Sequence, residues 1–375
     1  MSGSGGSVRQ RKPDQWEGRY RVDGRAKSVY GRTKRETQEK LRAALTQAGA
    51  GVKPTTTRLT VAAYLTDWLE ASVKPQRRAT TYASYEDTVR RFLIPAIGRH
   101  PLTKLEPGHV QRMLADLSTR ETARGRLSPT TVRYCYTILR VALGRAYKQG
   151  LVVRNVATLV DAPSKANVEM HPLSAEQART FLASVSAGPR EALYVTALYT
   201  GLRQGELLGL RWQDVDLEGA VLAVRHTLQR RTHELGEPKT ERGRRTLRLP
   251  GDAVAALPRH KVAQLEQRLR AGRKWQDHDL VFTTSLGTPL DARNVTRLLQ
   301  AALERAGLPR QRFHDLRHAY ATLLLEAGEE LAVVSKMLGH ADLGTTADVY
   351  AHLTRGMQDR AAARMDAILG RAATG

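Results

Sequence analysis

The chain has 375 residues, of which 60 are Lys or Arg and 37 are Asp or Glu, so its formal net charge is +23 at pH 7. A surplus of this size is unusual for a metabolic enzyme and favours a polyanionic partner, nucleic acid first and an anionic membrane surface second. The sequence excludes wholesale disorder, a transmembrane helix and a signal peptide. Because Cys135 is the single cysteine, it also excludes a disulfide framework and a Cys-based zinc site. These exclusions predict a soluble intracellular protein.

Residues 1–57 predict a small basic domain made of a sheet followed by one helix. The dipeptide Asp23-Gly24 is typical of a type I′ hairpin turn between two strands. Thr33 begins a capping box of the form Thr-x-x-Glu, which predicts a helix that ends near Gly49. Because so short a segment has a marginal core of its own, we expect its strands to gain stability or a purpose on a partner.

Residues 58–163 predict an all-helical domain, which follows a polar linker. Ser128-Pro129 is a typical helix start, since proline suits the first helical position. We expect Pro95 to end the second helix, because proline cannot donate to the helical ladder. From the apolar periodicity, the helices are expected at 59–72, 80–94, 106–117 and 129–147. A second linker, 164–170, ends this domain.

Residues 171–375 predict a mainly α domain of mixed α/β type. Helices extend through Leu210, strands are expected at 220–228 and 244–249 with a basic turn between them, and helices resume after Asp252. An Ala-rich tail helix is expected from about residue 356. The predicted fold class is therefore multidomain, with a small sheet-plus-helix domain, an all-α domain and a mainly α mixed domain.

The segment TGLRQGELLGL at residues 200–210 contains the first candidate site. Arg203 lies among apolar residues, and Glu206 follows three positions later on the presumed helix. A guanidinium held by a carboxylate in apolar surroundings is an oriented anion clamp. The same pair can also be purely structural and fix the start of a helix. No phosphate loop of the GxxxxGK[ST] type is present.

The segment FHDLRH contains the second candidate site. His314, Arg317 and His318 share one face of a helix, since positions three and four apart are neighbours. Two histidines four apart also occur in zinc motifs, but an arginine on the same face opposes a divalent cation, so no metal is expected. A phosphate-binding His–Arg pair is the sharper interpretation, and a solvated helix cap is the plainer one.

Three further residues are ordinary when each is considered alone. Lys239 lies in the turn between the two predicted strands, where a lysine is usually solvated. His340 follows a glycine at a predicted helix end. Tyr350 lies beyond a polar turn, and a lone tyrosine usually belongs to a core.

In their order and separations, these residues resemble the catalytic motifs of the tyrosine recombinases, specifically phage-type integrases with the three-domain architecture of lambda integrase. TGLRQGELLGLRW is similar to the motif of the first catalytic arginine, and HDLRHAYAT to the HxxR motif. LGHADLGTTADVYAH is similar to the motif that ends in the nucleophilic tyrosine. The helical middle domain matches more loosely, and residues 1–57 resemble the arm-binding domain.

The resemblance implies a site-specific recombinase that integrates and excises a mobile element through a 3′-phosphotyrosyl intermediate, without metal, ATP or any cofactor. Two permanently charged guanidiniums suit the charge that develops on the phosphate, and a tyrosine with a pKa of about 10 needs help to lose its proton. The resemblance assigns general-acid chemistry to Lys239 and makes Glu206 the residue that orients Arg203. The implied catalytic residues are Arg203, Lys239, His314, Arg317, His340 and Tyr350, with Tyr350 as the nucleophile.

The implied partner is double-stranded DNA at the core and arm sites of an attachment region. The resemblance also implies four protomers in the synapse, with an excisionase and a host DNA-bending protein as candidate partners, in the bacterial cytoplasm and on its nucleoid, without a membrane. DNA contacts are expected from side chains of the first two domains: Arg19, Arg21, Arg25, Lys27, Lys74, Arg77, Arg78, Thr130, Thr131 and Arg133.

Two other functions fit the same composition. A type IB-like topoisomerase uses similar chemistry to relax supercoils, but relaxation needs no distant second binding site of the kind that the basic hairpin suggests. A catalytically inactive DNA-binding or architectural protein would need only the charge, but then there would be no reason for all six catalytic positions to be filled.

Overall fold

The computed structural model describes residues 6–22, 25–49, 59–123, 125–164, 171–230, 232–238 and 241–339. The chain divides into two compact units, Met1–Val168 and Glu169–Gly375. The tail helix that the sequence predicts from about residue 356 lies outside the described residues.

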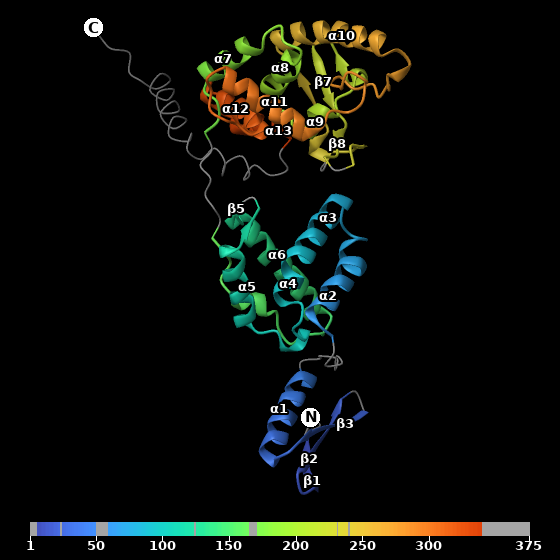
Figure 1. Ribbon diagram of the computed structural model, residues 1–375, viewed down its shortest axis with the longest axis vertical. Coiled ribbons are helices and arrows are strands. Elements are labelled where there is room, and N and C mark those ends of the chain that lie inside the picture. The colour runs from blue at the N-terminus through green and yellow to red at the C-terminus, as the bar shows by residue number, and fades with distance from the viewer. Residues whose placement is uncertain are drawn as a thin grey trace, which may run out of the picture. The chain divides into compact units, whose positions relative to one another are not determined.

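The first unit begins with a three-stranded antiparallel sheet in the order β1-β2-β3 and one helix (Figure 1). The β2–β3 pairing extends to Val22 and Arg25, which confirms the hairpin predicted at Asp23-Gly24. The strand β1 was not predicted, because its sequence SVRQRK has almost no apolar residues to reveal an alternating pattern. The elements are β1 (Ser7–Lys12), β2 (Gln15–Val22), β3 (Arg25–Gly31) and α1 (Lys34–Gly49).

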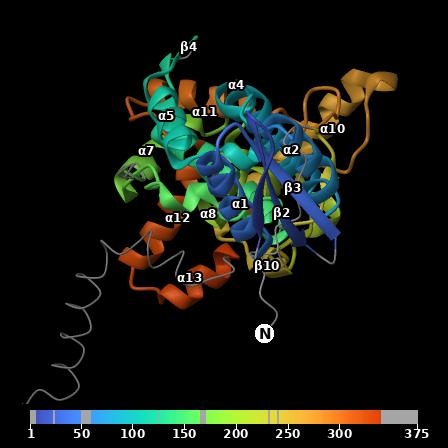
Figure 2. The same cartoon turned by 90° about the horizontal axis from the view of Figure 1, so that it is seen from below.

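Helix α1 lies against β2 and β3 on one face of this sheet, as both views of the ribbon show (Figures 1 and 2). The hydroxyl of Thr33 accepts the backbone N–H of Glu36 at 3.1 Å, so the helix begins where its sequence predicts. Gly18 faces the helix: a Cβ at this position would lie 3.2 Å from the Cβ of Leu41. Residues on either side of Gly18 therefore point to the opposite, open face of the sheet.

The rest of the first unit is helical, as predicted, around one apolar core. Ser128 caps the last long helix by accepting the backbone N–H of Thr131 at 3.2 Å. Short 3₁₀ turns at Leu102–Lys104 and Val156–Leu159 and a two-residue hairpin, β4 (Glu121–Thr122) with β5 (Gly125–Arg126), complete the unit. The helices are α2 (Val61–Trp68), α3 (Ala79–Thr88), α4 (Ile94–Ile97), α5 (Pro107–Thr119) and α6 (Pro129–Lys148), with π-helical turns at Leu69–Val73 and Val89–Leu93.

The prediction that Pro95 ends the second helix was wrong. Helix α3 passes into the π-helical turn Val89–Leu93, and Pro95 then lies in the first turn of α4, which extends to Ile97. In a regular α-helix the proline ring clashes with the carbonyl group four residues earlier. The wider π turn changes the backbone spacing directly before the proline, so the chain can continue as a helix.

The second unit combines helices with two small sheets. Its main sheet is antiparallel, in the order β10-β7-β6, and β8 pairs with β9 separately. The larger of two apolar clusters, which includes Phe181, Leu207, Leu222 and Phe313, joins most of the helices to the main sheet, and a smaller one packs α13 against the second half of α12. The elements are α7 (Ala175–Val185), α8 (Glu191–Thr200), α9 (Gln204–Leu208), β6 (Val215–Asp216), β7 (Val221–Val224), β8 (Thr227–Leu228), β9 (Leu235–Gly236), β10 (Arg245–Arg248), α10 (Gly251–Ala271), α11 (Ala292–Arg305), α12 (Phe313–Glu326) and α13 (Leu331–Leu338).

The single strand predicted at 220–228 is two strands, β7 and β8, which belong to different sheets. The break falls at Arg225 and His226, whose side chains each lie 3.4 Å from a carboxylate oxygen of the buried Asp214. Two adjacent residues that turn to one carboxylate cannot keep the alternation of a strand, so the chain changes sheet here. None of the described helices is both long and apolar enough to cross a membrane.

Candidate active site

Arg203 lies at the start of α9, directly after the end of α8. Gly201 ends α8 in the left-handed region, with φ +58°, and a Cβ there would clash with the ring of Tyr320. The carboxylate of Glu206 accepts the backbone N–H of Arg203 at 3.0 Å and its Nη1 at 2.7 Å. The pair expected from the sequence is therefore formed.

Glu206 has a second cationic partner, Arg245 of β10, which the sequence analysis missed. Its Nη2 donates to Oε2 of Glu206 at 3.0 Å, and the side chains of Arg245 and Glu206 are only 7% and 4% exposed. Burial acts to raise the pKa of Glu206, but the charges of Arg245 and Arg203 outweigh it, so this pKa lies below its ordinary value. The carboxylate between two guanidiniums therefore stays ionised.

The strand pattern contained a signal for Arg245. Leu247 and Leu249 are buried, whereas Thr246 and Arg248 are exposed. Since side chains alternate between the faces of a strand, Arg245 falls on the apolar face. An arginine on the buried face of an amphipathic strand needs a carboxylate partner, and that requirement would have identified it.

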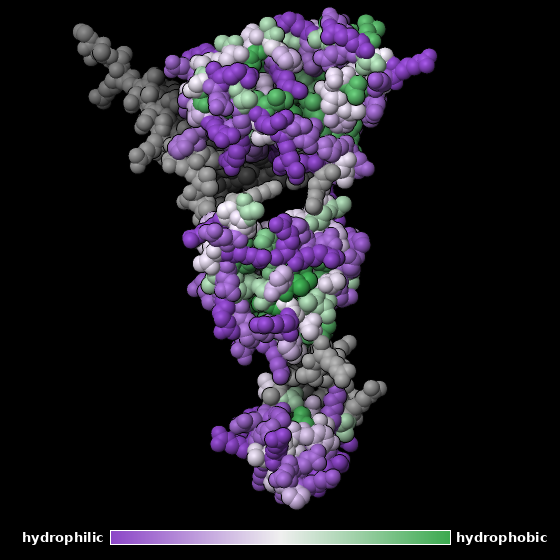
Figure 3. All heavy atoms as spheres, in the orientation of Figure 1, coloured by the Kyte–Doolittle hydropathy of each residue, from purple (hydrophilic) through white to green (hydrophobic). Residues whose placement is uncertain are grey.

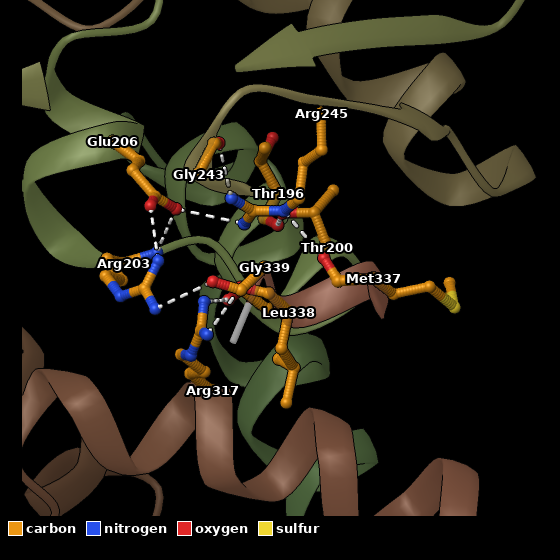
Figure 4. Close-up of polar contacts among 11 residues, drawn as sticks. Thr196, Thr200, Arg203, Glu206, Gly243, Arg245, Arg317, Met337, Leu338 and Gly339 are labelled. Atoms are coloured by element: carbon orange, nitrogen blue, oxygen red, sulfur yellow. Dashed lines mark hydrogen bonds and ion pairs between the residues drawn. The ribbon is translucent and has the colours of Figure 1, made fainter. Parts of the chain in front are cut away.

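Three guanidiniums converge on the C-terminal end of α13 (Figure 4). The last carbonyl groups of a helix lack partners within it and form the negative end of the helix dipole, so cations bind there favourably. The bonds are from Arg245 Nε to Met337 O at 2.6 Å, from Arg317 Nη2 to Leu338 O at 2.6 Å and from Arg203 Nη2 to Gly339 O at 3.4 Å.

Arg317 connects this helix end to the turn after α8. The residue is 2% exposed, and its Nη1 donates to the carbonyl oxygen of Gly201 at 2.8 Å. Gly339 ends α13 in the left-handed region, with φ +65°, directly before His340 in the sequence. Arg203 and Arg317, the two arginines predicted from the sequence, are thus both fixed at the C-terminal end of α13. His340 follows this helix end directly in the sequence.

His314 lies one helical turn before Arg317 on α12. Its ring meets the edge of the His318 ring, with centroids 4.8 Å apart. Partial desolvation, aided by the charges of His318, Arg317 and Arg203, lowers the pKa of His314 to about 4. The ring is therefore neutral at pH 7 and can accept a proton or donate a hydrogen bond. Within the described ranges, no three His, Cys, Asp or Glu side chains are grouped as a metal site requires.

The structure brings together Arg203, His314 and Arg317, with Glu206 beside them. The other three candidates lie outside the described residues: Lys239, His340 and Tyr350.

The predicted DNA contacts of the N-terminal sheet divide between its two faces. By the alternation of β2, Arg19 and Arg21 lie on the open face. Lys27 pairs with Tyr20 across β2 and β3, which places it on the face toward α1. Arg25 begins β3, and its side chain lies outside the described residues.

The predicted contacts of the helical part occupy helix ends. Lys74 is exposed and pairs with Glu70 at 2.6 Å, and Arg78 is the N-cap residue of α3. Arg133 donates Nη1 to the carbonyl oxygen of Pro163 at 2.5 Å, so it fastens α6 to the end of this unit. The remaining three are Arg77, which is exposed before α3, and Thr130 and Thr131 in the first turn of α6.

Two family models match the chain. The phage integrase family matches residues 172–357, and the phage integrase N-terminal SAM-like domain matches residues 60–118. An integrase from Streptomyces ambofaciens is 32% identical over 354 residues, which cover 91% of this chain and 88% of that protein. A tyrosine recombinase XerC-like protein from Caldanaerobacter subterraneus subsp. tengcongensis is 30% identical over 348 residues, which cover 87% of this chain and 88% of that protein.

Solved structures share the fold at lower sequence identity. The Tn1549 transposon integrase in complex with transposon right end DNA superposes with a TM-score of 0.70 at 21% identity, over 83% of this chain and all of that chain. A lambda integrase dimer bound to a COC′ core site gives a TM-score of 0.59 at 18% identity, over 91% of this chain and 93% of that one.

Proposed function

Because this chain belongs to the phage integrase family, and is therefore a tyrosine recombinase that cuts and rejoins DNA, we propose that Arg203 and Arg317 bind the scissile phosphate and that Tyr350 attacks it. The observation that best supports this assignment is the convergence of both guanidiniums at the end of α13. The sequence continues from that point to His340 and then to Tyr350.

The proposed reaction conserves the phosphodiester energy. The phenolic oxygen of Tyr350 forms a bond to phosphorus, and the 5′ oxygen of the broken strand leaves, which gives a 3′-phosphotyrosyl link and a free 5′ hydroxyl. Attack by the 5′ hydroxyl of a second strand reverses the step and releases the tyrosine. Negative charge develops on the non-bridging oxygens in the transition state, where two fixed guanidiniums stabilise it.

The proton transfers need groups that can change protonation near neutral pH. His314, neutral because its pKa is lowered, can take the phenolic proton or hold a phosphate oxygen. Lys239 protonates the departing 5′ oxygen, and His340 donates a hydrogen bond to the phosphate. Glu206, ionised between Arg203 and Arg245, keeps the first guanidinium oriented.

DNA binding is divided among three domains in this proposal. Residues 1–57 bind arm sites, and the helical domain of residues 58–163 together with the catalytic domain of residues 171–375 binds the core site. Four protomers assemble on two duplexes in the synapse, where an excisionase and a host DNA-bending protein set the direction. The reaction takes place on the nucleoid, in the bacterial cytoplasm. The charge of +23 supports an extended contact with phosphates, whose affinity falls steeply with salt.

A nicked duplex that contains the DNA flanking the gene tests the proposal. The nick lies close to the cleavage position, so the short fragment that carries the free 5′ hydroxyl diffuses away after cleavage. Without that hydroxyl the strand cannot be resealed, so the covalent protein–DNA adduct accumulates and is seen on a denaturing gel. We expect an adduct with the wild-type chain and none with Tyr350→Phe. A wild-type chain that binds this DNA but leaves no adduct would instead be a DNA-binding protein, and relaxation of supercoils without exchange between two sites would indicate a topoisomerase.

A further inference from the structure

A buried carboxylate lies at the centre of the open face of the N-terminal sheet. Glu17, in the middle strand β2, is 1% exposed. In the strand register, Glu17 lies opposite Arg9 of β1 on one side and opposite Tyr30 of β3 on the other. An ionised group this well covered needs several hydrogen-bond partners.

Every strand of the sheet supplies partners to Glu17. Ser28 donates its hydroxyl at 2.7 Å and Tyr30 donates its hydroxyl at 3.3 Å. The hydrogen bond from Ser28, with those from Arg9 and Arg19 and the charge of Arg11, lowers the pKa of Glu17 to about 2 in spite of its burial. Three arginines, called here the arginine cluster, donate through Nε: Arg9 at 2.9 Å, Arg11 at 3.0 Å and Arg19 at 3.3 Å.

The choice of nitrogen leaves the outer edge of two of these arginines available, whereas Nη2 of Arg9 also lies 2.9 Å from the carboxylate. Arg11 and Arg19 bind Glu17 through Nε, and among the described residues their terminal nitrogens Nη1 and Nη2 have no partner. The three side chains of the cluster are about half exposed, at 52%, 48% and 51%. Figure 3 shows that the visible surface of this sheet and helix is mostly hydrophilic. The free pair of terminal nitrogens is the edge with which arginine binds guanine O6 and N7.

Holding the guanidiniums in advance has an energetic consequence. A free arginine side chain loses rotamer entropy when it binds a base, and three neighbouring cations without a counter-charge would repel one another. A central carboxylate removes most of the repulsion and fixes each guanidinium before DNA arrives, so less entropy is lost on binding.

We propose that Glu17 is a positioning residue that aims the arginine cluster at guanine edges in the major groove. The inference rests on the proposed function of residues 1–57 as a DNA-binding domain, and it adds both a target, guanine-containing arm sites, and the residue that organises their recognition. Glu17 itself touches no DNA, since the cluster covers it.

Charge alone and positioning predict opposite results for Glu17→Gln. The variant removes a negative charge from a DNA-binding surface, which by charge alone strengthens binding to any duplex. Positioning predicts weaker binding to the preferred sequence, because the arginine cluster loses the negative charge and one of the two acceptor oxygens that fix it. Glu39→Gln is the matched control, since Glu39 lies on α1 of the same domain, is well exposed and pairs only with Arg35 among the described residues.

The experiment selects duplexes from a randomised pool with the full-length wild-type chain and sequences them. Positions whose enrichment disappears when Arg19→Ala is used are assigned to the sheet, and we expect guanines there. With Glu17→Gln we expect loss of that enrichment and about 10-fold weaker binding of the selected duplex, with unchanged or tighter binding of the unselected pool. Glu39→Gln should keep the enrichment.

Two results separate the inference from its premise. If Arg19→Ala leaves every enriched position in place, the sheet does not recognise DNA, and both proposals fail. If Arg19→Ala removes positions that Glu17→Gln keeps, the sheet recognises DNA and the role of Glu17 is overturned. If Glu17→Gln lowers the melting temperature, Ser28→Ala is the deciding variant, because it removes only one hydrogen bond from the same carboxylate. A partial loss of enrichment with Ser28→Ala supports the inference. Unchanged enrichment with Ser28→Ala contradicts it.

Discussion

Arg203 and Arg317 come from different helices but donate to the carbonyl oxygens of adjacent residues, Gly339 and Leu338. The C-terminal end of α13 therefore fixes the spacing between the two guanidiniums. In the sequence, the segment that contains His340 follows this helix end directly. A change at any of these contacts should affect cleavage before it affects DNA binding.

Arg317→Lys should abolish cleavage although it keeps the positive charge. Arg317 binds Gly201 and Leu338 through two different nitrogens of its planar fork, whereas a lysine has a single nitrogen on a differently shaped side chain, so it cannot reproduce both bonds and still bind a phosphate. We expect at least about a 100-fold loss of adduct formation, as for removal of one oriented donor to a transition state. The exposed Arg310→Lys is the control on the same segment and should cleave normally, and an Arg317→Lys variant that cleaves as fast as the wild type would contradict the proposed role.

Arg245→Gln should reduce both stability and cleavage. It leaves the buried carboxylate of Glu206 with one cationic partner instead of two and removes a bond to the end of α13. Breaking a buried ion pair typically costs about 3 kcal/mol, which calorimetry of the full chain would detect.

The control for this variant is Arg248→Gln in the same strand, because Arg248 is exposed and bonds only to the carbonyl of Gly219 among the described residues. It should change the free energy of unfolding by less than about 0.5 kcal/mol. Equal effects of the two variants would show that Arg245 has no special role in the site.

The sequence was sufficient where the local pattern is self-contained. Thr33 and Ser128 mark helix starts through bonds within one turn, and these starts are found as predicted. It failed where partners distant in the sequence decide the structure. The strand break at Arg225 depends on Asp214, and the partner of Arg245 is Glu206, so the local strand pattern could indicate a buried arginine at 245 but not which carboxylate it binds.

Gly201→Ala should be more damaging than its backbone conformation alone explains. The left-handed φ of +58° costs an alanine about 1 kcal/mol, and its Cβ would also clash with the ring of Tyr320. Relieving that clash moves the carbonyl that binds Arg317, so cleavage should fall together with stability. Gly307→Ala isolates the backbone cost, since Gly307 has a similar φ of +68° with open space around its Cβ position. Chemical unfolding and adduct formation are measured for both variants. Equal losses of stability and of cleavage in Gly201→Ala and Gly307→Ala would refute this account.

Acidification should destabilise the wild-type chain more than a His314→Gln variant. The pKa of His314 is lowered to about 4 in the folded protein, whereas an unfolded histidine has a pKa of about 6.5. Between these values the unfolded chain binds more protons, so the free energy of unfolding falls as the pH falls through this window, and glutamine removes that loss. Urea unfolding at pH 7 and pH 4.5 measures this fall in the free energy of unfolding. The exposed His278→Gln is the control, and its free energy of unfolding should change with pH as that of the wild type does. Parallel pH curves for wild type and His314→Gln would mean that the folded site does not hold this ring neutral.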